Sequence, residues 1–173
     1  MNNELGRLSV EQYRKADKAP VALVLDGVRS QHNIGSAFRT CDAFRVGKIC
    51  LCGISATPPT PEIHKAALGA EFSVDWAYYE TALDAVEALR SEGYTIVSVE
   101  QAEQATQLQD FRPEAGRRYA LVFGNEVKGV SQEVVDASDR CIEIPQYGTK
   151  HSLNVSVSIG IVLWSLMLNG ARG

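Results

Sequence analysis

The 173-residue chain contains no apolar stretch long enough to span a bilayer. The longest run, Ile159–Leu168, is interrupted by Gly160 and Ser165, whereas a transmembrane helix needs about 20 predominantly apolar residues. The N-terminal residues also lack the basic-then-apolar pattern of a secretory signal. We therefore expect a cytoplasmic protein that is not associated with a membrane.

The chain also lacks the patterns of metal-binding and dinucleotide-binding proteins. Its four cysteines and three histidines are not spaced as metal ligands, so no metal is expected. The cysteines occupy apolar or strand-like segments, which favours reduced core thiols; they are Cys41, Cys50, Cys52 and Cys141. No Gly-x-Gly-x-x-Gly turn follows the first predicted strand, which argues against a nucleotide-binding oxidoreductase.

Acidic residues are unevenly distributed. The net charge is −4, but residues 1–70 carry nine Lys or Arg against six Asp or Glu, and residues 71–143 carry six against fifteen. Residues 144–173 contain two basic residues and no acidic residue. The acidic overall composition argues against strong nonspecific affinity for nucleic acid. A basic face built from the two ends of the chain and an ordinary distribution of solvated charge are both compatible with this pattern.

Strand and helix patterns alternate along the chain. Short apolar or β-rich runs predict buried strands at Val21–Leu25, Lys48–Cys52, Asp75–Tyr78, Tyr94–Val99, Tyr119–Phe123 and Cys141–Ile144. Helices are predicted at Leu5–Ala16, Ser36–Phe44, Glu62–Leu68, Ala82–Ser91, Ser131–Ser138 and Leu153–Leu168, with a polar loop at Asp26–Gly35. This alternation predicts a single α/β domain over residues 1–173, with a mostly parallel sheet flanked by helices and a short helical extension at residues 1–19.

Three polar segments stand out from this pattern: Asn33–Thr40, Phe123–Val130 and Ile144–Ser158. Each places glycine and a side-chain amide at the end of an apolar run. A loop that leads into a helix N-terminus presents unpaired backbone N–H groups, which suit a polar ligand. Because ligand loops lie at the carboxyl ends of strands in such sheets, the three segments predict one composite site.

In order, the three segments resemble the motifs of the SPOUT methyltransferases, in the TrmH-like branch that methylates ribose 2′-hydroxyls of tRNA or rRNA. The motifs are Asn-x-Gly-x-x-x-Arg, Gly-Asn-Glu-x-x-Gly, and Ile-Pro followed by Gly and Ser-Leu-Asn-Val-Ser. The resemblance covers roughly Val21 to Leu168. It implies a C-terminal trefoil knot, S-adenosylmethionine as cofactor, an RNA substrate, and a homodimer with active sites at the subunit interface.

The resemblance implies five residues at the catalytic centre: Arg39, Asn33, Glu126, Ser152 and Asn154. A guanidinium is essentially always charged, so we expect Arg39 to bind phosphate and stabilise the developing alkoxide, while the group that removes the proton stays open. Asn33 is expected to orient Arg39 or the ribose. Glu126 is expected to fix the loop or contact the substrate, or simply to cap the loop. Ser152 and Asn154 match the polar pair that lines the active site in this family. They can also act as the N-cap and a first-turn contact of the terminal helix, and the two roles can coexist.

The same resemblance implies contacts to the cofactor from three segments. They are expected at Val99, Glu100, Phe123, Gly124, Asn125, Ile144, Gln146, Ser152 and Leu153. Gly124, Ile144 and Leu153 are expected to supply backbone hydrogen bonds and apolar walls, since glycine permits a close approach of the ligand. A simple turn glycine is the alternative for Gly124.

The RNA substrate is the least determined element. Residues 92–101 and 141–146 resemble tRNA ribose methyltransferases that act on the D-loop guanosine, so tRNA is expected before rRNA. An rRNA guanosine, a pyrimidine in the anticodon loop, or a noncatalytic RNA-binding module on the same fold are the alternatives. His32, Lys150 and His151 are candidate RNA contacts. No separate RNA-binding domain is expected ahead of the first strand.

The terminal helix carries large apolar side chains that two roles explain equally well. Trp164, Leu166 and Met167 can pack in the core or contribute to a dimer interface.

Overall fold

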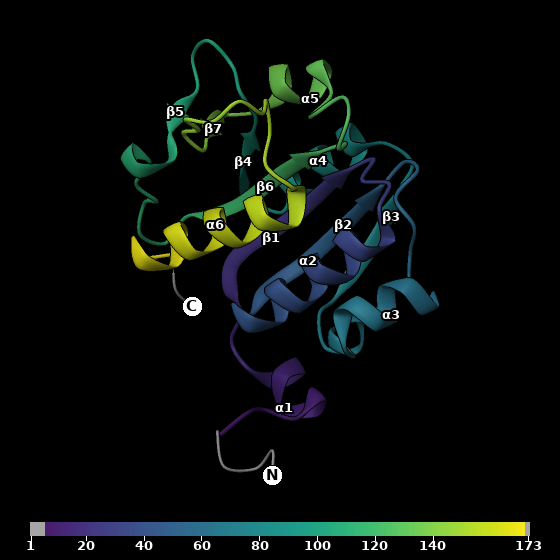
Figure 1. Ribbon diagram of the computed structural model, residues 1–173. Coiled ribbons are helices and arrows are strands. Elements are labelled where there is room, and N and C mark those ends of the chain that lie inside the picture. The colour runs from purple at the N-terminus through teal and green to yellow at the C-terminus, as the bar shows by residue number, and fades with distance from the viewer. Residues whose placement is uncertain (1–5, 172–173) are drawn as a thin grey trace.

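The computed structural model describes residues 6–171 as three layers built around one sheet (Figure 1). All neighbouring strands in the sheet are parallel, in the order β3-β2-β1-β6-β4-β7-β5. The strands are β1 (Ala19–Asp26), β2 (Val46–Cys52), β3 (Trp76–Tyr79), β4 (Tyr94–Val99), β5 (Thr106–Gln107), β6 (Arg118–Gly124) and β7 (Arg140–Glu143). The predicted α/β fold with a parallel sheet is therefore confirmed.

Helices cover both faces of the sheet, in two separate apolar cores. The helices are α1 (Val10–Lys15), α2 (Gln31–Ala43), α3 (Pro61–Ala67), α4 (Ala82–Ser91), α5 (Gln132–Ala137) and α6 (Val155–Leu168), with short 3₁₀ turns η2 (Ala70–Phe72) and η3 (Leu108–Asp110). Figure 1 shows α2, α3 and α6 on one face, while α4 and α5 contribute to the core on the other. Burial on both faces explains why the central strands read as continuous apolar runs.

Three of the four cysteines behave as core residues, as expected, whereas Cys141 on β7 is only partly buried. Cys50 and Cys52 lie in the core under α4, whereas Leu51 between them faces the opposite core. All four thiols are free, and burial raises the pKa of the Cys50 thiol to about 11. A thiol with so high a pKa stays neutral and unreactive near neutral pH.

The helix that carries the first motif begins earlier than predicted. We expected a loop through Gly35 and a helix from Ser36, but α2 starts at Gln31. Ser30 is the N-cap, and its side-chain oxygen accepts a hydrogen bond from the backbone amide of Asn33 at 3.2 Å. Gly35 misled the prediction because it was taken for a loop residue. A Cβ at Gly35 would lie 2.5 Å from the carbonyl oxygen of Ile63, so glycine is required where α2 packs on α3.

The first helix is shorter than predicted. Ser9 forms a capping box with Gln12, so α1 begins at Val10, and Glu11 and Lys15 form an ion pair at 2.7 Å. The predicted start at Leu5 lies outside the described residues. The two-residue strand β5 was not predicted because it is too short to show a pattern.

The other predicted elements are confirmed, with ends that differ by at most two residues. The strand order, in which β6 lies between β1 and β4 while β7 lies beyond β4, is consistent with a knotted C-terminal part. The threading itself stays a prediction from the family resemblance.

Two properties concern residues 6–171 as a whole. Within this range no helix has the length and apolarity needed to cross a membrane. In the same range no three His, Cys, Asp or Glu side chains are grouped so that they could hold a metal ion.

Candidate active site

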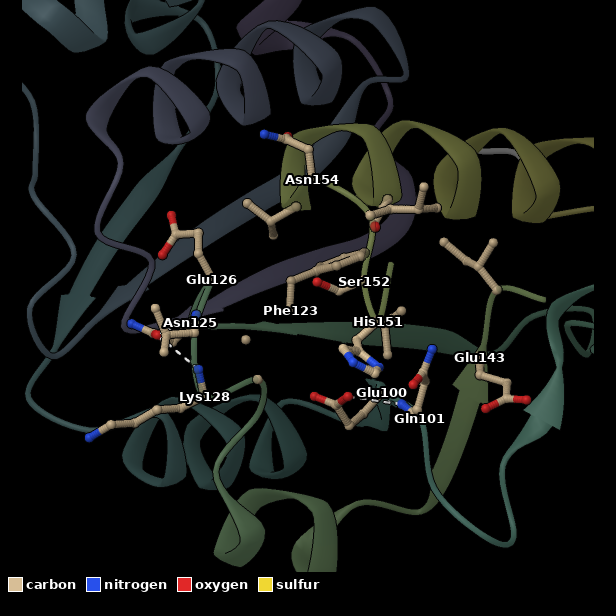
Figure 2. Close-up of a pocket in the computed structure, with 18 of the residues that line it drawn as sticks. Glu100, Gln101, Phe123, Asn125, Glu126, Lys128, Glu143, His151, Ser152 and Asn154 are labelled. Carbon is tan, nitrogen blue, oxygen red and sulfur yellow. Dashed lines mark hydrogen bonds between the residues drawn. The ribbon is translucent and has the colours of Figure 1, made fainter. Parts of the chain in front are cut away.

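A pocket of about 450 Å³ lies at the carboxyl ends of β4, β6 and β7 (Figure 2). Its walls come from the segments after these strands and from the segment that leads into α6. A pocket of this volume lies within the usual range for small-molecule sites. Its lining consists of Val99, Glu100, Gln101, Phe123, Gly124, Asn125, Glu126, Val127, Lys128, Gly129, Glu143, Ile144, Gln146, His151, Ser152, Leu153, Asn154, Val155 and Ser158.

Every residue expected to contact a cofactor lines this pocket. Among the expected catalytic residues, Glu126, Ser152 and Asn154 also line it. Asn33 and Arg39 do not. The second and third motifs therefore form the pocket, and the first motif lies beside it.

A chain of side-chain hydrogen bonds joins the three motifs. The amide nitrogen of Asn33 donates to Glu126 at 3.4 Å, and the amide nitrogen of Asn154 donates to the Asn33 oxygen at 3.3 Å. Asn33 is only 6% exposed, so water competes little for these bonds. Residues 33, 126 and 154, far apart in sequence, thus form one composite structure.

Glu126 fixes the segment before α2. Its two carboxylate oxygens accept hydrogen bonds from the backbone amides of Arg29 at 3.0 Å and Ser30 at 3.1 Å. Partial burial by itself raises the pKa of this carboxyl, but these bonds and the one from Asn33 outweigh it and lower the pKa below its usual value. The carboxylate is therefore ionised at neutral pH, and the geometry fits the expected role in fixing a loop.

The loop after β6 closes into a tight turn around Asn125. The Asn125 oxygen accepts from the amides of Val127 and Lys128, and its nitrogen donates to the carbonyl of Gly27 at 2.7 Å. Backbone bonds of 2.9 and 3.0 Å pair Asn125 with Gly129. This turn forms one wall of the pocket.

Gly124 is required by this turn. A Cβ at Gly124 would lie 2.0 Å from the backbone carbon of Gly129 and 2.1 Å from the nitrogen of Val130. Real Cβ atoms do not approach the backbone so closely. The alternative role of Gly124, that of a turn glycine, therefore has a clear physical basis. Close approach of a ligand at this position is compatible with it.

Glu100 supports the same turn from β4. Its carboxylate accepts hydrogen bonds from the amides of Val130 and Gln101, each at 2.9 Å. A Cβ on Gly129, whose φ is +70°, would lie 2.2 Å from this carboxylate. The expected cofactor contact at Glu100 is thus also a structural residue.

Asn154 caps the terminal helix. Its side-chain oxygen accepts from the backbone amide of Ser156 at 2.9 Å, and α6 begins at Val155 rather than at the predicted Leu153. The capping role offered as an alternative is present, together with the bond to Asn33. Ser152 lies at the pocket wall before this cap and is exposed.

Arg39 lies outside the pocket of its own chain. It is exposed on α2, and within residues 6–171 its side chain forms no hydrogen bond and no ion pair. The other candidate RNA contacts are exposed as well: His151 lines the pocket, while His32 and Lys150 do not.

Several pocket residues were not predicted. They are Gln101, Val127, Lys128, Gly129, Glu143, Val155 and Ser158. Gln101 directly follows a predicted contact, Val127, Lys128 and Gly129 lie in the turn after β6, Glu143 ends β7, and Val155 and Ser158 lie in the first turn of α6. Their position relative to the strand ends, rather than their residue type, could have identified them.

The SpoU rRNA methylase family model matches residues 20–164 of the chain. The chain is 32% identical over 157 residues to a TrmH family tRNA/rRNA methyltransferase of Staphylococcus saprophyticus, covering 91% of this chain and 62% of the relative. It is 31% identical over 165 residues to the tRNA (guanosine(18)-2′-O)-methyltransferase of Thermus thermophilus, covering 93% and 81%. The protein therefore belongs to the SpoU methylase family.

Solved structures show the same fold. The AdoMet-bound rRNA methyltransferase of Sinorhizobium meliloti superposes with a TM-score of 0.79 at 27% identity, over 88% of this chain and 58% of that one. The chain thus spans less than two thirds of the length of this structure and of the Staphylococcus relative.

Proposed function

We propose that the protein transfers a methyl group from S-adenosylmethionine to a ribose 2′-hydroxyl of RNA, most readily of a tRNA guanosine. The observation that carries this proposal is the hydrogen-bonded connection of Asn33, Glu126 and Asn154 beside a pocket of suitable size. The names of the similar proteins, an AdoMet-bound rRNA methyltransferase and a tRNA guanosine 2′-O-methyltransferase among them, support it.

The pocket suits the cofactor chemically. Phe123, Ile144 and Leu153 supply apolar surface for an adenine ring, and backbone groups of the three segments supply polar contacts. Glu100 and Glu143, with Glu126 already described, bring negative charge to the lining. Such a lining attracts the positive charge of a sulfonium ion. The bound cofactor would supply an electrophilic methyl group.

The chain's own residues would bind and orient the ribose. The connection between Asn33 and Asn154 holds the first motif against the pocket rim, so a hydroxyl there can meet the methyl group in line. Arg39, brought to the pocket by a second subunit, would bind the neighbouring phosphate and stabilise the alkoxide that develops as the proton leaves. The group that accepts the proton is not assigned.

A homodimer would complete the site. Arg39 does not line the pocket of its own chain, and one face of α6 exposes apolar side chains at helical spacing: Val157, Ile161, Trp164 and Leu168. Of the three residues first considered on this helix, Trp164 is 57% exposed while Leu166 and Met167 are buried in the core. We propose that this face packs on a second subunit, whose Arg39 then approaches the pocket. A cytoplasmic location is part of the same proposal.

The test is a methyl-transfer assay with labelled S-adenosylmethionine and bulk tRNA, using the wild-type protein and Arg39→Ala. Labelled tRNA from the wild type and at least a hundredfold less from Arg39→Ala are expected, because loss of one stabilising group at an oxyanion costs about 10²–10³ in rate. Label in rRNA but not in tRNA would favour the rRNA alternative. No label with either RNA, together with retained RNA binding, would favour a noncatalytic module.

A further inference from the structure

A second hollow of about 330 Å³ lies behind the turn that walls the active-site pocket. Its lining consists of Asp26, Arg29, Ile54, Asn125, Val127, Lys128, Gly129 and Ser131. Four of these residues, Asn125, Val127, Lys128 and Gly129, line both cavities, so a single turn of the chain separates them. Figure 2 shows the Lys128 side chain extending away from His151 and Gln101 in the first pocket.

The second hollow presents two cations without partners. Arg29 and Lys128 are exposed, and their side chains form no hydrogen bond and no ion pair within residues 6–171. Asp26 supplies the one carboxylate of the lining, and one of its oxygens accepts from the Ser131 amide at 2.9 Å. Two cations against one carboxylate give this concave lining a net positive charge, which attracts an anionic ligand such as a phosphate.

Apolar surface lies beside these charges. Ile54 is 68% exposed and Val127 is 80% exposed, although large aliphatic side chains are usually buried. They come from the segments after β2 and β6, on either side of the hollow. A nucleotide fits this combination, because its phosphate can meet the cations while the flat face of its base packs on the aliphatic side chains.

We propose that this hollow binds a nucleotide of the substrate RNA that neighbours the methylated one. Arg29 and Lys128 hold its phosphate, and Ile54 and Val127 contact its base. The RNA strand then passes over the Asn125–Gly129 turn, which places the target ribose at the rim of the first pocket. The inference rests on the proposed function, because it takes RNA as the substrate.

The test measures tRNA binding by fluorescence anisotropy in the presence of S-adenosylhomocysteine, over a series of salt concentrations. Arg29→Ala and Lys128→Ala are each expected to weaken binding at least about tenfold, because each removes a hydrogen bond to a charged phosphate. Each is also expected to flatten the slope of log K against log salt by about 0.7, because one phosphate contact is lost. The double variant should show both effects combined.

The matched control is Arg117→Ala, which removes the same charge at the amino end of β6, where Arg117 pairs with Glu114 at 2.7 Å. Its affinity and salt slope are expected to equal those of the wild type. Ile54→Ser and Val127→Ser should weaken binding while leaving the salt slope unchanged, because they remove no charge. Arg29→Ala should keep the wild-type affinity for S-adenosylhomocysteine, since Arg29 lies outside the first pocket.

Two results would overturn the inference. One is a double variant with wild-type affinity and salt slope for tRNA, and the other is an equal loss in Arg117→Ala, which would indicate nonspecific attraction. If the wild type binds S-adenosylhomocysteine and methylates RNA in either case, the proposed function stands without the second site. If the wild type neither binds the cofactor nor methylates RNA, the proposed function fails, whatever the tRNA affinities show.

Discussion

Replacing Gly124 by alanine tests whether this glycine serves the backbone or the ligand. The added methyl group would lie 2.0 Å from the backbone of Gly129 and 2.1 Å from that of Val130. Backbone atoms cannot rotate away as a side chain does, so the turn has to move. Overpacking of this kind costs about 1–3 kcal/mol, and occasionally more. We therefore expect Gly124→Ala to lower the free energy of unfolding by at least about 1 kcal/mol.

The assay is urea unfolding followed by circular dichroism, with Gly148→Ala as the matched control. Gly148 lies in the segment leading to α6, and a Cβ there would meet no atom within 4 Å, so little change in stability is expected. The displaced turn should also weaken binding of S-adenosylhomocysteine. A Gly124→Ala protein with wild-type stability and lost binding would refute the steric reasoning and assign the glycine to ligand contact alone.

Three further changes separate function from stability. Arg39→Ala should leave the melting temperature within about 1 °C of the wild type, because the Arg39 side chain is exposed and has no hydrogen-bond or ion-pair partner within residues 6–171. A marked loss of stability by calorimetry would contradict this. The lowered pKa of Glu126 stabilises the fold at neutral pH, and that stabilisation is lost as pH falls below about 4.5 through the folded-state pKa. The free energy of unfolding of Glu126→Gln should therefore depend less on pH over this range. A pH dependence equal to that of the wild type would refute the assignment. Trp164→Glu should convert the proposed dimer into a folded monomer in sedimentation analysis. A wild-type protein that is itself monomeric would refute the proposed interface.

Much of the fold was visible in the sequence because its strands are buried on both faces. Runs such as Val21–Leu25 and Tyr119–Phe123 are typical of interior strands of a parallel sheet, which they form here. The ends were less visible, since caps and short bridges depend on tertiary contacts. Gly35 is the clearest case: its place inside α2 follows from contact with α3, which no local pattern reveals.

The sequence predicted the pocket lining where motif residues lie at strand ends. It did not separate the ligand-binding role of a residue from its structural role. Glu100 and Asn154 line the pocket as expected, yet each also satisfies backbone amides that hold the pocket walls. A sequence motif cannot separate such roles, because both require the same residue. Arg39 does not line the pocket of its own chain. The sequence of one chain does not show which residues a second subunit would bring to that pocket.

The central claim is that the three motifs form one site for methyl transfer to ribose. The most direct measurement is nucleoside analysis by mass spectrometry of bulk tRNA incubated with the protein and methyl-labelled S-adenosylmethionine. We predict label on a 2′-O-methyl nucleoside, with 2′-O-methylguanosine foremost, and loss of that product with Arg39→Ala. Label on a base, or label that persists undiminished in Arg39→Ala, would contradict it.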